Sequence, residues 1–200
     1  MQIPAEALFT TQHGRVCFVL AEEGMRGIAS MISAIMNGTA AEVRLLESEV
    51  ERLVQDPQDA GVLEPLVDYA LPEARFTATA LARGTIFVLL FACLERVLRV
   101  IAEDHAPNPT AVRRHLNGNR DIGKVRAYLS YLRDDLSLTF SIPAHLEVLL
   151  RWENRRRNQF VHGDWEWLYD DPREVDFVAP LRAITALLTE LETSSSAAES

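Results

Sequence analysis

Cysteine is scarce in this sequence of 200 residues, in which Cys17 and Cys93 are the only two. Two cysteines this far apart argue against a disulfide framework, and they lack the short spacing of zinc-binding groups. No apolar run approaches the roughly 18 residues of a membrane-spanning helix. The N-terminus lacks a basic region followed by an apolar stretch and a cleavage site, so we expect no secretory signal. These absences favour a cytoplasmic protein without a membrane partner.

Positive charge is also in short supply. The chain carries 20 lysines and arginines against 29 acidic residues, for a net charge of -9 at pH 7. Sequence-independent binding of nucleic acid requires many cations, so the composition argues against that class of protein. Residues 42–68 hold eight acids and two arginines, and we interpret them as a solvated face rather than a binding surface. A small basic site on an acidic body remains compatible with these numbers.

Strand-like alternation and internal repeats are absent too, whereas helical periodicity runs through most of the chain. We therefore predict an all-α protein. The first helix is expected at 16–36, where Asn37-Gly38 would end it. Thr39 and Glu42 have the spacing of a capping box, which predicts a second helix up to about residue 56.

The longest helix is predicted at 73–103, after a short helical piece at 62–69. Its centre is apolar on every side, which predicts a buried central helix. Glu95 follows this centre directly, so its carboxylate needs a partner or a place at the edge of the core.

The second half of the chain predicts four more helices. Two short ones are expected at 110–116 and from 121 onward, the latter with Ile122, Val125, Leu129 and Leu132 inward. A third should run from Ser141 and Pro143 to about Val161, with Gly163 just past its end. The last has an apolar stripe formed by Leu181, Ile184, Leu187, Leu188 and Leu191. We expect residues 193–200 to be disordered, and we divide the rest into an N-terminal helical segment, 1–71, and a helical core, 72–192.

A basic cluster stands out between Arg151 and Asp164, which read R-W-E-N-R-R-R-N-Q-F-V-H-G-D. Arg157, Asn158 and His162 within it spell R-N-x-x-x-H. This pattern resembles the signature of the HEPN domain, an all-helical family with an RNase site made from those three residue types. The resemblance covers mainly 72–191, and the apolar helix with Glu95 adds to it weakly. It implies a HEPN-like bundle with an additional N-terminal segment, a homodimer, and a toxin or antiviral role with an antitoxin or defence-system partner.

The chemistry of these side chains suits RNA cleavage. His162 has a side chain that exchanges protons near neutral pH, and Asn158 lies one helical turn before it. Arg157 offers a permanent cation to the phosphorane, and Arg151, Arg155 and Arg156 are candidates for RNA binding. Glu95 and Glu153 are candidates for support of the site. The scheme uses no metal and no cofactor.

Structural roles compete with this interpretation. Arg157 also suits an ion pair with Glu153 or Glu95, and it lies about 140° from His162 on an ideal helix. His162 beside Gly163 suits a helix C-terminus, where cations are favoured. Asn158 suits an ordinary surface position. Two functions therefore follow: a metal-independent endoribonuclease, or a catalytically silent HEPN-like module that binds RNA or protein.

Overall fold

The computed structural model describes residues 3–55, 60–152, 158–164 and 177–198 of the chain. Helices and short turns account for nearly all of these residues, and no strand occurs among them, which confirms the all-α prediction. Within the described ranges, no helix combines the length and the apolar character needed to cross a bilayer.

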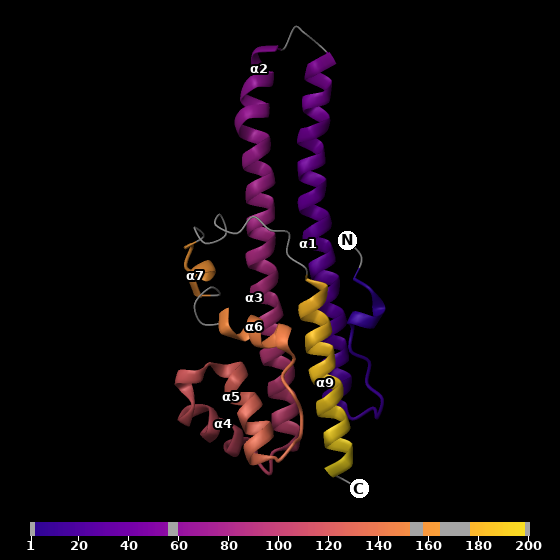
Figure 1. The fold of residues 1–200 in the computed structure, drawn as a ribbon, viewed down its shortest axis with the longest axis vertical. Coiled ribbons are helices and arrows are strands. Elements are labelled where there is room, and N and C mark those ends of the chain that lie inside the picture. Colours follow the sequence, from indigo (N-terminus) through magenta and orange to yellow (C-terminus); the bar gives the residue numbers. More distant parts are fainter. Residues whose placement is uncertain (1–2, 56–59, 153–157, 165–176, 199–200) are drawn as a thin grey trace.

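Two long helices, α1 and α3, form the spine of the molecule (Figure 1). α1 spans Val16–Gln55, and α3 spans Leu71–His105. At 1.5 Å per residue they are about 60 Å and about 52 Å long. Between them lie α2, Ala60–Pro65, and a π-helical turn, η3, Leu66–Ala70. The upper parts of α1 and α3, together with α2 between them, extend beyond the helices of the second half of the chain (Figure 1).

The predicted break at Asn37-Gly38 is wrong, because α1 continues through both residues. A helix-ending glycine adopts a positive φ, and Gly38 is not among the glycines that do so. The hydroxyl of Thr39 donates to the backbone oxygen of Met36 at 3.1 Å, a bond made within the helix rather than at its start. Packing of α1 against α3 thus outweighs the local stop signal.

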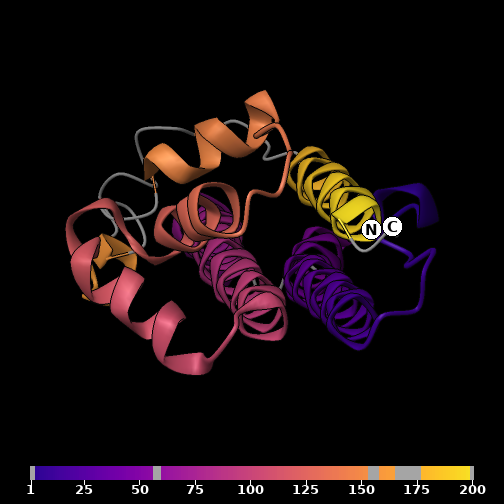
Figure 2. The same ribbon diagram turned by 90° about the horizontal axis from the view of Figure 1, so that it is seen from below.

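The remaining described helices lie beside the lower and middle parts of α1 and α3 (Figures 1 and 2). They are a 3-10 turn η1, Ala5–Ala7; α4, Pro109–Gly118; a 3-10 turn η4, Arg120–Ile122; α5, Lys124–Ser130; a π-helical turn η5, Tyr131–Asp135; α6, Ala144–Trp152; α7, Asn158–Val161; and α9, Val178–Ala198. Asn108 caps α4 by accepting from the N–H of Ala111 at 3.0 Å. Gly123, with a φ of 81°, separates η4 from α5. Ile122 falls before this break and is exposed, so its inward position was predicted wrongly.

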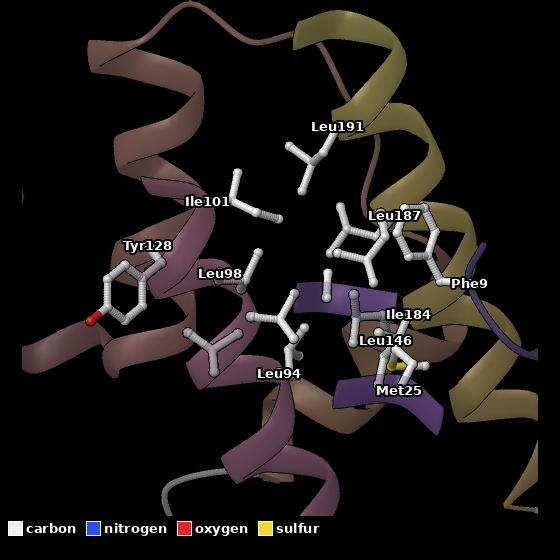
Figure 3. Close-up of a cluster of buried hydrophobic side chains, with 14 of the residues drawn as sticks. Phe9, Met25, Leu94, Leu98, Ile101, Tyr128, Leu146, Ile184, Leu187 and Leu191 are labelled. Carbon is white, nitrogen blue, oxygen red and sulfur yellow. The ribbon is translucent and has the colours of Figure 1, made fainter. Parts of the chain in front are cut away.

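The core lies where the spine, α5, α6 and α9 meet (Figure 3). All five residues of the apolar stripe predicted for the last helix are buried: Leu181, Ile184, Leu187, Leu188 and Leu191. Phe9 and Met25 from the N-terminal segment pack in the same cluster as Leu94 of α3. Residues from 1–71 and from 72–192 therefore share one core.

Hydrogen bonds join the N-terminal loop, residues 11–13, to the C-terminal helix α9. Glu192 of α9 is 2% exposed, and its carboxylate accepts from the hydroxyl of Thr11 at 2.5 Å and from the N–H groups of Gln12 and His13 at 3.1 Å. α9 continues to Ala198, and Ser195 is buried within it. The prediction of a disordered tail from residue 193 is therefore wrong for 193–198, because contacts with the N-terminal loop and α3 hold the Ser/Ala-rich end in the helix.

Candidate functional site

The described part of the signature forms a single helical turn, α7, Asn158–Val161. The N–H of Gly163 donates to the oxygen of Phe160 at 3.1 Å, and that of Asp164 to the oxygen of Gln159 at 2.9 Å. These two bonds, with Gly163 at a φ of 81°, make a Schellman ending. The prediction that Gly163 lies just past the helix is confirmed. His162 takes the last position before the glycine.

Phe160 fixes this turn to the spine. Its ring packs with Phe76 and Ala80 in a small cluster on α3. It also lies against Gly84, where the methyl group of an alanine would overlap the ring. Only a glycine leaves room for an aromatic ring this close to a helix backbone. The contact sets the position of α7 along α3.

The polar residues of the turn face solvent. Asn158 and His162 are both exposed, and the N–H of His162 donates to the backbone oxygen of Asn158 at 3.0 Å. The structure therefore brings these two predicted site residues together, one turn apart. Their side chains are open to a ligand while Phe160 of the same turn is packed against α3.

The other predicted site residues are placed in part. Arg151 is exposed near the end of α6, where it can reach a phosphate in solution. Glu153, Arg155, Arg156 and Arg157 lie outside the described residues, so the convergence of Arg157 with His162 stays a prediction. Residues 144–152 of the predicted signature helix are helical as expected, and Leu146, Leu149 and Leu150 on its apolar face are buried.

Glu95 lies at the edge of the core, as its surroundings in the sequence required. It accepts an ion pair from Lys124 of α5 at 3.0 Å. Gly84 is eleven residues away on the same helix, which corresponds to about 16 Å. Glu95 thus sits well along α3 from the point where α7 docks, and its supporting role for His162 stays a prediction.

Sequence reasoning missed a basic pocket beside Glu95. Arg96 and Arg99 line a hollow of about 230 Å³ together with Ala92 and Glu95. Both arginines are exposed, and neither forms an ion pair with the described part of the chain. Their spacing of three residues puts them on one helix face, and this spacing could have indicated the basic pocket from the sequence. They add positive charge to α3 away from the signature.

Three metal-ligating side chains also meet, although their spacing in the sequence did not suggest it. The thiol of Cys17, the carboxylate of Asp104 and the imidazole of His105 lie within 4.8 Å of one another. Each already has protein partners: Asp104 pairs with Arg15 at 2.6 Å, and His105 contacts the backbone oxygen of Ile101 and the hydroxyl of Ser195. Burial, followed by the nearby Asp104 charge, raises the pKa of the Cys17 thiol to about 12. A protonated thiol is a poor metal ligand. We therefore interpret this cluster as a structural contact between the start of α1 and the end of α3.

The arrangement around α7 places two polar side chains of the signature in solvent beside a packed aromatic ring. His162 is an exposed histidine, Asn158 lies one turn from it, and the ring of Phe160 packs against α3. Comparison of the chain with protein-family models, with curated proteins and with solved structures found no match.

Proposed function

We propose that this protein is a metal-independent endoribonuclease of the HEPN type, acting as a toxin or antiviral effector. The proposal rests on the contrast between buried and exposed side chains in residues 158–162, which comprise α7 and His162 directly after it. Phe160 is packed on Gly84, whereas Asn158 and His162 of the same turn are exposed. A proton-transfer group requires access to its substrate, and both side chains have that access.

The proposed reaction is attack by the RNA on itself. The 2′-oxygen forms a bond to the neighbouring phosphorus, the bond from phosphorus to the 5′-oxygen breaks, and a proton moves from the first oxygen to the second. His162 supplies the proton exchange at one of these oxygens, and Asn158 orients the imidazole or a substrate oxygen. Arg157 supplies positive charge to the phosphorane, where charge develops in the transition state.

The partners follow from the same proposal. RNA is the substrate, bound through Arg151 and the neighbouring arginines 155 and 156 of the signature. A second copy of the chain completes a composite cleft, and an antitoxin or defence-system protein controls it. Light scattering that gives only monomer at micromolar concentration would remove the composite cleft from the proposal.

Replacement of His162 by alanine tests the function. The side chain is exposed, so helical content and melting should match the wild type, while RNA cleavage should fall by at least about a hundredfold. His145→Ala on α6 is the matched control, because His145 is also an exposed histidine and the variant should cleave normally. Undiminished cleavage by a folded His162→Ala protein would favour the silent binding module, and an unfolded one would make His162 structural.

A further inference from the structure

A second group of reactive side chains lies outside the signature, between α4, α5 and η5. The Nδ1 atom of His115 is 2.9 Å from the carboxylate of Asp135, and its Nε2 atom is 2.8 Å from the hydroxyl of Ser130. The imidazole thus stands between an acid and a hydroxyl, with one contact on each nitrogen. This is the order of contacts that activates a nucleophilic serine.

The π-helical turn η5 builds this arrangement. Ser130 precedes the turn and Asp135 ends it, five residues later. In an α-helix, residues five apart diverge by about 140°, whereas a π-helix has a wider turn that brings them toward one face. The N–H of Leu136 donates to the oxygen of Tyr131 at 3.2 Å, which is the i→i+5 bond of such a turn. π-turns of this kind recur at functional sites.

The side chain of His115 is held in orientation but remains partly exposed to solvent. Its ring meets the ring of Tyr131 edge-on, with centroids 5.3 Å apart. The side chains of His115 and Asp135 are 15% and 48% exposed, and Ser130 is half-buried. All three side chains thus lie at or near the surface rather than in the core.

We propose that Ser130, His115 and Asp135 form a nucleophilic serine site that accepts an acyl group from a small ester or thioester with a good leaving group. The carboxylate of Asp135 accepts a hydrogen bond from Nδ1–H, which fixes the tautomer whose Nε2 accepts the serine proton. This activity is independent of the proposed ribonuclease, because it uses no residue of the signature.

The proposed step is acyl transfer. The oxygen of Ser130 bonds to the acyl carbon, its proton passes to Nε2 of His115, and the leaving group departs with that proton. Water then attacks the acyl-serine with His115 as base, which releases the acid and restores the hydroxyl. The N–H of Tyr131 already donates to the oxygens of Ala127 and Tyr128, so it does not serve an oxyanion. This restricts the substrates to acyl groups with good leaving groups and excludes amides.

One contact competes with activation. The Ser130 hydroxyl also lies 3.0 Å from the backbone oxygen of Ala127, and one hydrogen cannot serve both acceptors at once. Rotation of the hydroxyl determines whether it donates to the oxygen of Ala127 or to Nε2 of His115. Asp135 favours donation to His115, because its hydrogen bond with Nδ1–H keeps Nε2 as an acceptor.

A fluorophosphonate probe tests the site, since serine attack on its phosphorus forms an oxygen–phosphorus bond and expels fluoride. The purified full-length protein should take up one label, located at Ser130 by mass spectrometry of the tryptic peptide 127–133. Ser130→Ala should lose the label. Asp135→Asn, which keeps the side-chain volume at an exposed position, should slow labelling by at least about tenfold, since the equivalent change in serine proteases costs about 10⁴.

Two controls make the result specific. Asp134→Asn changes the neighbouring exposed acid and should label at the wild-type rate. Ser48, an exposed serine whose hydroxyl donates to a helix carbonyl, should remain unlabelled in the wild type. Absence of label at Ser130, labelling spread equally over exposed serines, or an unchanged rate in folded Asp135→Asn would each overturn the proposal. His162→Ala should label normally, which separates this site from the ribonuclease.

Discussion

Phe160 of α7 packs on Gly84 of α3 so closely that a methyl group at position 84 would overlap the aromatic ring. This contact joins the signature to the spine of the molecule. It gives a reason for a glycine within an apolar helix, where glycine lowers helix stability by about 1 kcal/mol relative to alanine. The position of His162 depends on the contact, because only one residue separates His162 from Phe160 along the chain.

Gly84→Ala should therefore destabilise the protein in spite of the better helix propensity of alanine. We expect a loss of about 1–3 kcal/mol from overpacking and a clear loss of RNA cleavage. Gly38→Ala is the matched control, since nothing lies within 4 Å of its added methyl group, and it should gain up to about 1 kcal/mol. Urea unfolding and a cleavage assay measure both effects. Equal behaviour of the two variants would show that Phe160 does not dock at Gly84.

Local sequence signals predicted most of the helices and the helix end at Gly163, but they failed at two other predicted ends. The stripe from Leu181 to Leu191 repeats at helical spacing, and the structure buries it as predicted. Asn37-Gly38 failed as a stop signal because pairing of α1 with α3 overrides local propensity. The Ser/Ala-rich end was wrongly predicted to be disordered, because hydrogen bonds of Ser195 with His105 and Arg15 stabilise its helix, and both partners are distant in the sequence.

The candidate site was predictable only as a motif. The pattern R-N-x-x-x-H located Asn158 and His162 on an exposed turn, but nothing in the pattern indicated Gly84 as the docking point. The contacts of His115 with Ser130 and Asp135 were equally hidden. They depend on a π-helical turn that hydrophobic periodicity does not reveal.

Glu192→Ala should be among the most destabilising changes in the chain. Its buried carboxylate accepts from Thr11, Gln12 and His13, and its loss removes the protein acceptor of all three donors. We expect a decrease of roughly 3 kcal/mol in the free energy of unfolding. Glu51→Ala, at an exposed position on α1, should change it by less than about 0.5 kcal/mol. A mild effect at Glu192 would mean that the N-terminal loop contributes little to stability.

Stability should fall in alkaline solution. Burial is the main cause that raises the pKa of Cys17 to about 12 and that of Cys93 to about 11, and it also raises the pKa values of Tyr128 and Tyr131. A group whose pKa is higher in the folded than in the unfolded protein stabilises the fold fully at pH values below its unfolded pKa, which is near 9 for a thiol. This stabilisation is lost as the pH rises toward the pKa of the folded protein. Urea unfolding between about pH 8 and about pH 11 should show the decline, and it should be shallower in Cys17→Ala. An identical slope in that variant would contradict the assignment to Cys17.

Two arginines should affect cleavage differently. Arg157→Ala removes charge from the phosphorane and should lower turnover by roughly a hundredfold or more. Arg151→Ala, at an exposed position on α6, should weaken RNA binding and reduce the slope of log affinity against log salt by about one. Single-turnover cleavage and binding at several salt concentrations separate the two. Equal and mild effects would reduce the basic cluster to general attraction of RNA.

The central proposal is cleavage of RNA by its own 2′-hydroxyl with a histidine and an arginine. The most direct test incubates purified protein with end-labelled single-stranded RNA in excess EDTA and identifies the new termini. We predict cleavage with 2′,3′-cyclic phosphate and 5′-hydroxyl ends, with no cleavage of DNA or of RNA carrying a 2′-deoxy residue at the cut site. Cleavage that EDTA abolishes and magnesium restores, or products with 5′-phosphate ends, would contradict the mechanism.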